Sequence, residues 1–207
     1  MSEGVTVDSY RSTNQQKHTA TNWFYRKHLD AFYEKLYEMI EATECESLLD
    51  AGCGEGFVVD YLAQRNPNLK LTGIDVSSDA IEYAKAHFGE KARFRPGSVY
   101  KLPFSDKSFD TILCSEVLEH LDDPNRAVGE LKRVARKHVV ITVPHEPYFQ
   151  WLNNLGKLAG VATDPGHVNF WTKNTFQAFI RVHFEAPTFA WKQLYQLASA
   201  PAHPGES

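Results

Sequence analysis

The residues best suited to bind a nucleotide form a glycine-rich loop at residues 50–56. Gly52 and Gly54 have no Cβ atom, so the backbone there can turn sharply and lie close against a ligand. Asp75 follows about twenty residues later, at the spacing where an acid accepts hydrogen bonds from ribose hydroxyls. A tight turn without a ligand, with Asp75 as a helix cap, is the simpler alternative. The loop and the acid together favour a nucleotide pocket.

The spacing of the glycines separates two classes of cofactor. Dinucleotide-binding loops follow Gly-x-Gly-x-x-Gly/Ala, but here Phe57 occupies the sixth position and Gly56 comes only two residues after Gly54. Asp50 adds a carboxylate two residues before Gly52. It would repel a pyrophosphate but attract the ammonium and sulfonium groups of S-adenosylmethionine. The loop therefore favours S-adenosylmethionine over NAD.

A second group of polar residues contains two carboxylates and an imidazole, from Glu116, Glu119 and His120. If the chain is helical here, spacings of three and four residues put them on one face. They would then either share protons, with Glu116 and His120 as catalytic groups, or bind a cation. The alternative is that Glu119 and His120 only hold the loop in shape. His145 is a rival general base, unless it is simply an exposed loop histidine.

Alternating strands and helices would position these residues. Five segments are predicted to be strands, at residues 47–51, 70–75, 92–95, 109–114 and 138–143. The first is a short buried strand, and 109–114 has the apolar pattern of a parallel sheet covered on both faces. Helical periodicity and capping residues predict the helices, at residues 22–41, 57–64, from Ser77 or Ser78 onward, from Asp123 onward and at 172–182. Residues 184–197 would supply the last strands. This alternation predicts a doubly wound α/β fold, with ligands at the carboxyl ends of the strands.

The length of 207 residues suits one catalytic domain with additions. We expect residues 1–46 to form a segment and helix over the cofactor cleft, and residues 47–200 to form the domain. Within it, residues 145–171 would be an insertion on the substrate side. Its aromatic stretch either covers an apolar acceptor or packs into the core. Residues 201–207 are expected to be disordered.

The composition limits the classes of partner and the cellular location that we expect for this protein. The net charge of −4 gives no electrostatic footprint for nucleic acid or an anionic membrane, so a nucleic-acid partner is not expected. No apolar run is long enough to span a bilayer, and the N-terminus does not resemble a signal peptide. The three cysteines are scattered, which is typical of free thiols in a reducing compartment. We therefore expect a cytoplasmic protein; no feature predicts its oligomeric state.

Four motifs in order resemble the class I S-adenosylmethionine-dependent methyltransferases, particularly the group that includes the ubiquinone-biosynthesis O-methyltransferases. The motifs lie between residues 47 and 143, at 48–56, 73–77, 102–110 and 115–121. The resemblance implies a Rossmann-like, mostly parallel seven-stranded sheet with helices on both faces. It also implies transfer of a methyl group from S-adenosylmethionine.

The resemblance also assigns residues to parts of the cofactor. Gly52 and Gly54 would pass under its amino-acid part, and Asp75 would hold the ribose. The other contacts would be made around the adenine by Val76, Ser98 and Val99, and at the methionine end by Ser115.

Two positions depart from the family pattern. Ser98 stands where the family often has Asp, which would weaken the contact to the adenine amino group. Residues 136–138, Arg-Lys-His, replace the usual Pro-Gly-Gly before the fifth strand, so this turn must be built differently.

A second resemblance concerns His167, which precedes Trp171 and Thr172. This spacing is similar to the His-x-x-x-Trp-Thr of small-RNA 3′-end 2′-O-methyltransferases, which combine it with Glu-x-x-Glu-His to hold a divalent ion. The resemblance implies a metal site of Glu116, Glu119, His120 and His167. Such ligands suit magnesium, manganese or zinc.

These observations predict a methyltransferase for a small-molecule acceptor, most simply the hydroxyl oxygen of an aromatic or lipid-like compound. N- or C-methylation of a small molecule and 2′-O-methylation of RNA are the alternatives. A non-catalytic binding module is disfavoured because the glycines and Asp75 are intact. An NAD enzyme is disfavoured by Phe57 and Asp50.

Overall fold

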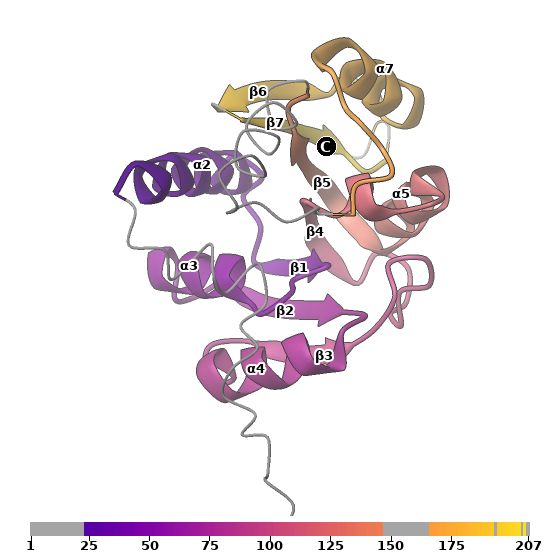
Figure 1. The fold of residues 1–207 in the computed structure, drawn as a ribbon. Coiled ribbons are helices and arrows are strands. Elements are labelled where there is room, and N and C mark those ends of the chain that lie inside the picture. Colours follow the sequence, from indigo (N-terminus) through magenta and orange to yellow (C-terminus); the bar gives the residue numbers. More distant parts are fainter. Residues whose placement is uncertain (1–22, 147–165, 193, 204, 206–207) are drawn as a thin grey trace, which may run out of the picture.

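The computed structural model describes residues 23–146, 166–192, 194–203 and 205 (Figure 1). In this part of the chain seven strands form one sheet, and they comprise β1 (Ser47–Ala51), β2 (Lys70–Asp75), β3 (Arg93–Pro96), β4 (Phe109–Ser115), β5 (Ala135–Pro144), β6 (Thr188–Lys192) and β7 (Tyr195–Pro201). Their order is β3-β2-β1-β4-β5-β7-β6. β7 runs antiparallel to both neighbours, and the other neighbouring strands are parallel. The predicted doubly wound α/β fold is confirmed.

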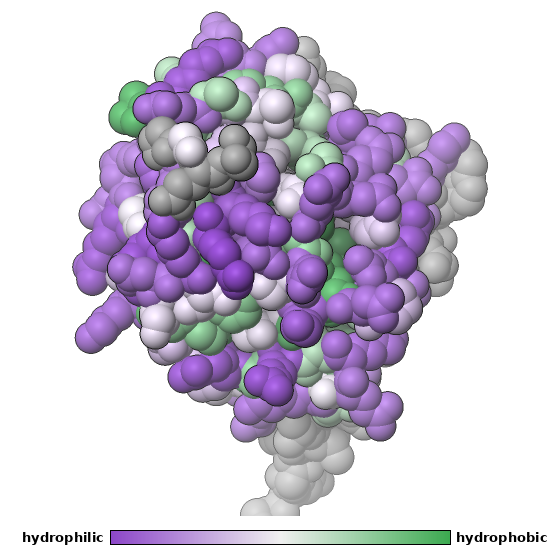
Figure 2. Space-filling view, turned by 180° about the vertical axis from the view of Figure 1, so that it is seen from behind, coloured by the Kyte–Doolittle hydropathy of each residue, from purple (hydrophilic) through white to green (hydrophobic). Residues whose placement is uncertain are grey.

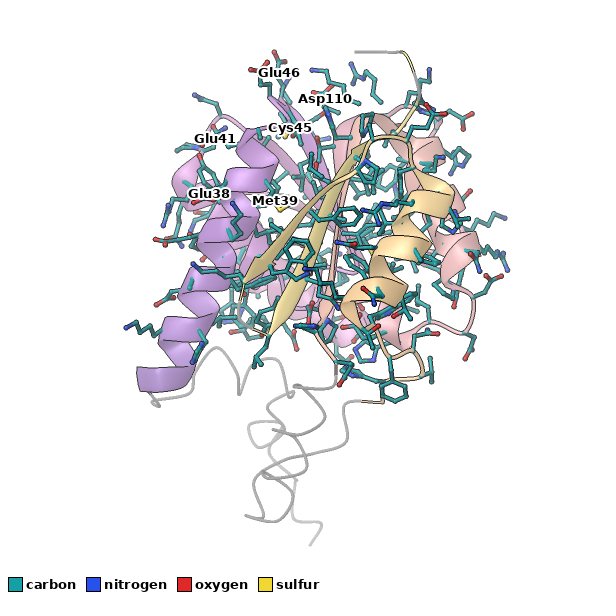
Figure 3. The ribbon with its side chains drawn as sticks, turned by 90° about the horizontal axis from the view of Figure 1, so that it is seen from above. Glu38, Met39, Glu41, Cys45, Glu46 and Asp110 are labelled. Carbon is teal, nitrogen blue, oxygen red and sulfur yellow. The ribbon has the colours of Figure 1, made fainter. Side chains whose placement is uncertain are left out.

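Helices cover both faces of the sheet. The described ones are α2 (Trp23–Glu41), α3 (Phe57–Arg65), α4 (Ser78–Phe88), the 3-10 turn η2 (Leu118–His120), α5 (Pro124–Val134) and α7 (Lys173–His183). α2, α3 and α4 pack into one apolar cluster, and α5 and α7 into the other. Seen from above, α2 lies on one side of the sheet, with α5 and α7 on the opposite side (Figure 3).

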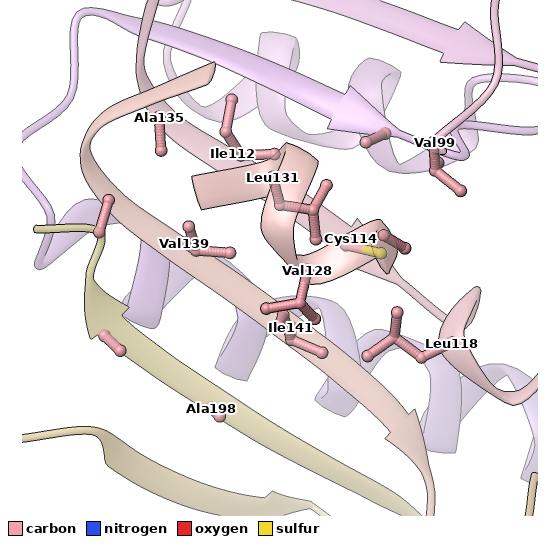
Figure 4. Close-up of a cluster of buried hydrophobic side chains, with 14 of the residues drawn as sticks. Val99, Ile112, Cys114, Leu118, Val128, Leu131, Ala135, Val139, Ile141 and Ala198 are labelled. Atoms are coloured by element: carbon pink, nitrogen blue, oxygen red, sulfur yellow. The ribbon is translucent and has the colours of Figure 1, made fainter. Parts of the chain in front are cut away.

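Both faces of the central strands are apolar because successive side chains of a strand point to opposite faces. On β1, Leu48 packs toward the cluster of α2, α3 and α4, whereas Leu49 packs toward that of α5 and α7. On β4, Leu113 and Ile112 divide in the same way. Figure 4 shows the second cluster, in which side chains of β4, β5 and α5 meet. These continuous apolar runs are why the strands could be predicted.

Side-chain caps fix where three helices begin. The Ser77 hydroxyl accepts a hydrogen bond from the amide of Ala80, 3.2 Å away, at the start of α4. Asp123 accepts one from the amide of Arg126, 3.1 Å away, before α5. Thr172 caps α7 in a capping box with Thr175. All three starts agree with the predicted positions.

The structure corrects two predicted boundaries. β5 begins at Ala135 rather than at residue 138, directly after α5, so residues 136–138 are strand and no separate turn is needed there. Ala202 and His203, in the tail expected to be disordered from Pro201, are bonded to this extension. The Ala202 amide donates to the Lys137 carbonyl at 2.8 Å, and an imidazole nitrogen of His203 lies 3.0 Å from the Ala135 carbonyl. The added length of β5 supplies the groups that hold the tail.

Asp110 lies near the start of β4, beside Cys45 and Glu46, which precede β1 (Figure 3). One of its carboxylate oxygens accepts hydrogen bonds from the backbone amides of Glu46 and Ser47, at 3.0 and 3.2 Å. Its other oxygen lies 3.5 Å from the guanidinium of Arg136 and 3.7 Å from the ammonium of Lys137. This buried acid ties the start of β4 to the starts of β1 and β5.

The surface seen in Figure 2 is mostly hydrophilic, with apolar side chains in small patches between polar ones. Among the described residues, no helix is both long and apolar enough to cross a membrane.

Candidate active site

A cavity of about 780 Å³ opens at the carboxyl ends of the parallel strands. Its size is typical of a pocket for a small molecule. All the residues predicted to bind the cofactor line it, namely Asp50, Gly52, Gly54, Asp75, Val76, Ser98, Val99 and Ser115. The structure therefore brings the predicted cofactor residues together from four separate segments of the chain.

The glycine loop approaches its neighbours too closely for a side chain. The amides of Gly52 and Cys53 both donate to the Ile74 carbonyl at 2.8 Å, which holds the loop against the end of β2. Gly52 has φ of 95°, and a Cβ atom there would lie 2.4 Å from a methyl carbon of Val117. Glycine is required at this position both by backbone conformation and by space.

Asp75 fixes the loop and the helix that follows. One carboxylate oxygen accepts a hydrogen bond from the Gly54 amide and the other from the Ser77 amide, each at 2.9 Å. Each oxygen keeps a second acceptor position for a hydroxyl of a ligand. The next residue, Val76, lines the cavity with 83% of its surface exposed. It offers an apolar contact for a flat ring beside the acid.

Asp50 is a buried acid on the cavity wall, with 1% of its surface exposed. Within the described part of the chain, neither of its carboxylate oxygens accepts a hydrogen bond. Burial, with the nearby Asp75 carboxylate, raises the pKa of Asp50 to about 7. A cationic group bound in the cavity would stabilise the ionised form and lower this pKa.

Glu116, Glu119 and His120 do not share a helical face, because the helix on which that arrangement depended does not form. Only residues 118–120 form a turn, the 3-10 turn η2, and Glu116 lies before it with φ of 58°. The Glu116 carboxylate instead accepts a hydrogen bond from the Thr142 hydroxyl at 3.1 Å, and that hydroxyl lies 2.9 Å from Ser115 Oγ. β5 therefore holds Glu116 at the cavity wall.

Glu119, His120 and His167 form a compact cluster on the same cavity. Each contributes one potential ligand atom, and these atoms lie within 4.8 Å of one another. The rings of His120 and His167 meet edge to face, with centroids 4.9 Å apart. Glu116 is not part of this cluster, so the structure joins three of the four predicted metal ligands.

Backbone and amide contacts hold the two segments of this cluster together. The amides of Val168 and Asn169 donate to the Glu119 carbonyl at 2.8 and 3.0 Å. The side-chain nitrogen of Asn169 donates to the carbonyls of Leu118 and Leu121, at 3.0 and 2.6 Å. Asn169 thus clamps the segment that carries His167 onto the turn that carries Glu119.

Comparisons with known proteins match part of the chain to methyltransferases. Residues 49–143 match the family model described as a methyltransferase domain. The chain is 30% identical over 174 residues to the uncharacterized methyltransferase YcgJ of Bacillus subtilis, covering 78% of this chain and 65% of that protein. The crystal structure of YcgJ is similar, with a TM-score of 0.61 at 26% identity, covering 77% of this chain and 71% of that one. Residues 49–143 form a class I S-adenosylmethionine-dependent methyltransferase domain.

Further relatives share this methyltransferase domain. A ubiquinone biosynthesis O-methyltransferase of Alkalilimnicola ehrlichii is 35% identical over 111 residues, covering 51% of this chain and 44% of that protein. The methyltransferase domain of bacterial CtHen1-C has the same fold, with a TM-score of 0.67 at 19% identity over 84% of this chain and 98% of that one. The chain spans less than two thirds of the length of the curated relatives that it matches.

The methyltransferase cavity is not lined by His145, so the structure does not place this predicted base beside an acceptor. The backbone amide of His145 donates to the Leu194 carbonyl at 2.7 Å. It is the next residue, Glu146, that lies near His167. The predicted substrate-side insertion, residues 145–171, lies largely outside the described residues, and residues 1–22, the segment before α2, lie entirely outside them.

Sequence reasoning missed two polar residues near the cluster, Glu146 and Asn169. Glu146 directly follows the noted His145, but no local pattern relates it to His167. Asn169 lies inside the His-x-x-x-Trp-Thr motif. Its position two residues after His167 was the only feature of the sequence that could have drawn attention to it. Both act on groups far away in the sequence, which local patterns do not show.

Proposed function

We propose that this protein transfers the methyl group of S-adenosylmethionine to the hydroxyl oxygen of a small aromatic or lipid-like acceptor. The observation that carries the proposal is that the glycine loop and the Glu119, His120 and His167 cluster line one cavity. Methyl transfer is an in-line displacement, so the protein must chiefly align the two reactants and keep water out.

The loop half of the cavity has the groups that S-adenosylmethionine requires. Bound there, S-adenosylmethionine supplies a methyl group on a sulfonium, which is already an excellent leaving group. Asp50 would bind its ammonium group, because a buried carboxylate with a pKa of about 7 gains most from a cation. Asp75 would accept from the ribose hydroxyls, and Val76 would pack on the adenine. The bare backbone of Gly52 and Gly54 leaves room for the amino-acid part.

The other half of the cavity can handle the proton of an acceptor hydroxyl. His120 and Glu116 both line the cavity, and each is a candidate to accept that proton as the new bond to carbon forms. His145 does not line it, so the proposal gives it no such role. His167, which also lines the cavity, takes its place as the third candidate.

The cluster also fits a divalent ion by the chemistry of its donors. One carboxylate and two imidazoles within 4.8 Å of one another suit zinc or manganese. Magnesium would also suit the cluster if it were bound by fewer of these protein ligands. Glu119, His120 and His167 would hold such an ion, with Glu116 at the side. It would lower the pKa of an acceptor hydroxyl.

Names of relatives support a small-molecule acceptor. They include a ubiquinone biosynthesis O-methyltransferase and a demethylmenaquinone methyltransferase of Thermotoga maritima, which is 32% identical over 50% of this chain. The negative net charge supports this acceptor class over RNA. The free thiols of Cys45, Cys53 and Cys114 support a cytoplasmic location.

A screen for S-adenosylhomocysteine formation tests the proposal. Purified protein is incubated with S-adenosylmethionine and catechols, phenols, amines or short RNAs, with and without a chelator. We expect turnover with catechols or phenols, and loss of that turnover in chelator. Turnover with RNA or amines alone would overturn the acceptor class, and turnover unchanged by chelator would overturn the metal.

A further inference from the structure

We infer that Glu146 is a positioning residue that fixes the orientation and tautomer of His167. Its carboxylate oxygen lies 4.0 Å from Nδ1 of His167, and both side chains are almost fully enclosed, at 5% and 7% exposure. His167 in turn belongs to the cluster with Glu119 and His120 on the cavity wall. The Glu146 carboxylate therefore lies next to Nδ1 of an imidazole that belongs to this cluster.

The backbone around Glu146 holds it in this place. Its amide donates to the Trp171 carbonyl at 3.0 Å. The buried side-chain nitrogen of Gln196, from the neighbouring strand β7, donates to the same carbonyl at 2.7 Å and to the Pro144 carbonyl at 3.2 Å. The end of β5 and the segment that carries His167 are thus joined by a shared hydrogen-bonding centre. This fixes the spacing of the two backbone segments that carry the carboxylate and the imidazole.

A carboxylate in this position selects one tautomer of His167. At 4.0 Å the contact is longer than a hydrogen bond, so the effect is electrostatic and strengthened by burial. The negative charge stabilises a proton on Nδ1, which leaves Nε2, across the ring, as the nitrogen that can accept a proton or bind an ion. A carboxylate behind a metal-binding histidine works in this way.

His120 shows the same arrangement with a different partner. Its Nδ1 lies 3.3 Å from the carbonyl of Gly166, which immediately precedes His167. Both imidazoles of the cluster therefore have Nδ1 next to an oxygen that accepts but cannot donate. Both then present Nε2 as the acceptor nitrogen. The role of Glu146 rests on the proposed function of the cluster, but its effect on the tautomer can be measured without any acceptor.

Nitrogen NMR of histidine-labelled protein tests this inference at alkaline pH, where imidazoles are neutral. The His167 signals are assigned by their loss in His167→Gln. We expect wild-type His167 to be mainly protonated on Nδ1. In Glu146→Gln, and more so in Glu146→Ala, the population should shift toward the Nε2-protonated form. His167 signals identical in wild type and Glu146→Ala would overturn the inference.

Asp110→Asn is the matched control, because it removes an equally buried carboxylate near the start of β4. It should leave the His167 tautomer unchanged, and a shift as large as in Glu146→Gln would overturn the inference. Binding of S-adenosylmethionine by each variant confirms folding, since Glu146 does not line the cavity.

Titration with Co²⁺, followed by its visible absorption, separates this inference from the metal proposal. If wild type binds Co²⁺, we expect Glu146→Gln to weaken binding 10- to 100-fold, as is typical of residues behind a metal-binding histidine. Undiminished affinity in Glu146→Gln would overturn the inference. If wild type binds no metal, the metal proposal fails, and the NMR comparison alone decides the role of Glu146.

Discussion

Asp50 is a carboxylate in a place where folding alone would not favour one. It is buried on the cavity wall beside a second acid, Asp75, and its pKa is raised to about 7 as a result. Such a group costs stability when it is ionised, because burial penalises the charge. Its presence is understandable if a bound cation offsets that cost. The cost and the benefit can be measured separately.

We expect Asp50→Asn to stabilise the unliganded protein at high pH. Between about pH 4 and pH 7, folded Asp50 keeps a proton that the unfolded chain has released. The contribution of Asp50 to the free energy of unfolding therefore falls as pH rises through this window and is constant above it. The advantage of Asp50→Asn should grow from pH 4 to pH 7, by an amount on the order of a few kcal/mol.

Urea unfolding of both proteins at a series of pH values measures this difference. Although Asp50→Asn should be more stable than wild type, it should bind S-adenosylmethionine at least tenfold more weakly at pH 8. A stability difference independent of pH would contradict the raised pKa of Asp50.

Gly52→Ala should reduce both stability and cofactor binding. The new Cβ would lie 2.4 Å from a methyl carbon of Val117, and the backbone would keep φ of 95°. The strained backbone alone costs about 1–3 kcal/mol. Adding Val117→Ala should recover only the part due to the contact. The free energy of unfolding and calorimetry with S-adenosylmethionine are the two measurements.

Gly129→Ala is the control for this prediction. Gly129 lies in α5, and a Cβ there would meet nothing within 4 Å. The exchange should stabilise the helix by about 0.5–1 kcal/mol. If Gly52→Ala behaved like Gly129→Ala, the close approach of the loop to Val117 would not be required.

At the scale of elements, the parts with a local signature were predictable. The strands that become β1, β2 and β4 show as apolar runs, and the caps Ser77, Asp123 and Thr172 mark helix starts. The extension of β5 and the attached tail were missed because their hydrogen bonds join residues 135–137 to residues 202–203. Long-range pairing of this kind leaves no periodic pattern in either segment.

In the candidate site, too, the residues with a local sequence pattern could be predicted and those held by long-range contacts could not. The glycine loop and Asp75 have a characteristic spacing, so they could be predicted from the residues alone, whereas Val76, Ser98, Val99 and Ser115 were predicted only from the family resemblance. A helix through Glu116 could be considered from the sequence because charged residues at spacings of three and four suit a helix regardless of tertiary structure, but only the η2 turn forms there. In place of a helix, the side chain of Asn169 holds the turn around Glu119 by its hydrogen bonds to the flanking carbonyls.

Asn169→Ala should loosen the cluster without unfolding the sheet. It removes two hydrogen bonds to the carbonyls of Leu118 and Leu121, at a cost of about 1–3 kcal/mol. The amides of Val168 and Asn169, which donate to the Glu119 carbonyl, should exchange with deuterium faster. Hydrogen-exchange mass spectrometry over residues 118–121 and 166–171 measures this. Exchange in these segments as slow as in wild type would contradict the clamp.

Asn68→Ala provides the comparison, since Asn68 is an exposed residue near the start of β2. Its effect on stability should stay within about 0.5 kcal/mol. Asn169→Asp should be more harmful than Asn169→Ala, because a carboxylate would face two carbonyl oxygens.

At the scale of the whole molecule, the cavity joins two halves of different origin. The half with the glycine loop comes from the ends of β1 and β2 and the segment after β3, and the polar cluster comes from the η2 turn and the segment before α7. Parallel strands bring these segments together because their carboxyl ends share one edge of the sheet. The apolar clusters on both faces hold that edge in place. The two halves should therefore bind their ligands separately.

Asp75→Asn and Glu119→Ala test whether the halves are separable. Asp75 binds the amides of Gly54 and Ser77, so Asp75→Asn places a donor group against one of them and should weaken binding of S-adenosylmethionine at least tenfold. It should leave the affinity for Zn²⁺ within about twofold. Glu119→Ala should weaken binding of Zn²⁺ and leave binding of S-adenosylmethionine unchanged, because the Glu119 carboxylate belongs to the cluster and not to the glycine loop. Calorimetry of both variants with each ligand gives four affinities. If Glu119→Ala abolished binding of S-adenosylmethionine as fully as Asp75→Asn, the cavity would be one cooperative site rather than two adjoining ones.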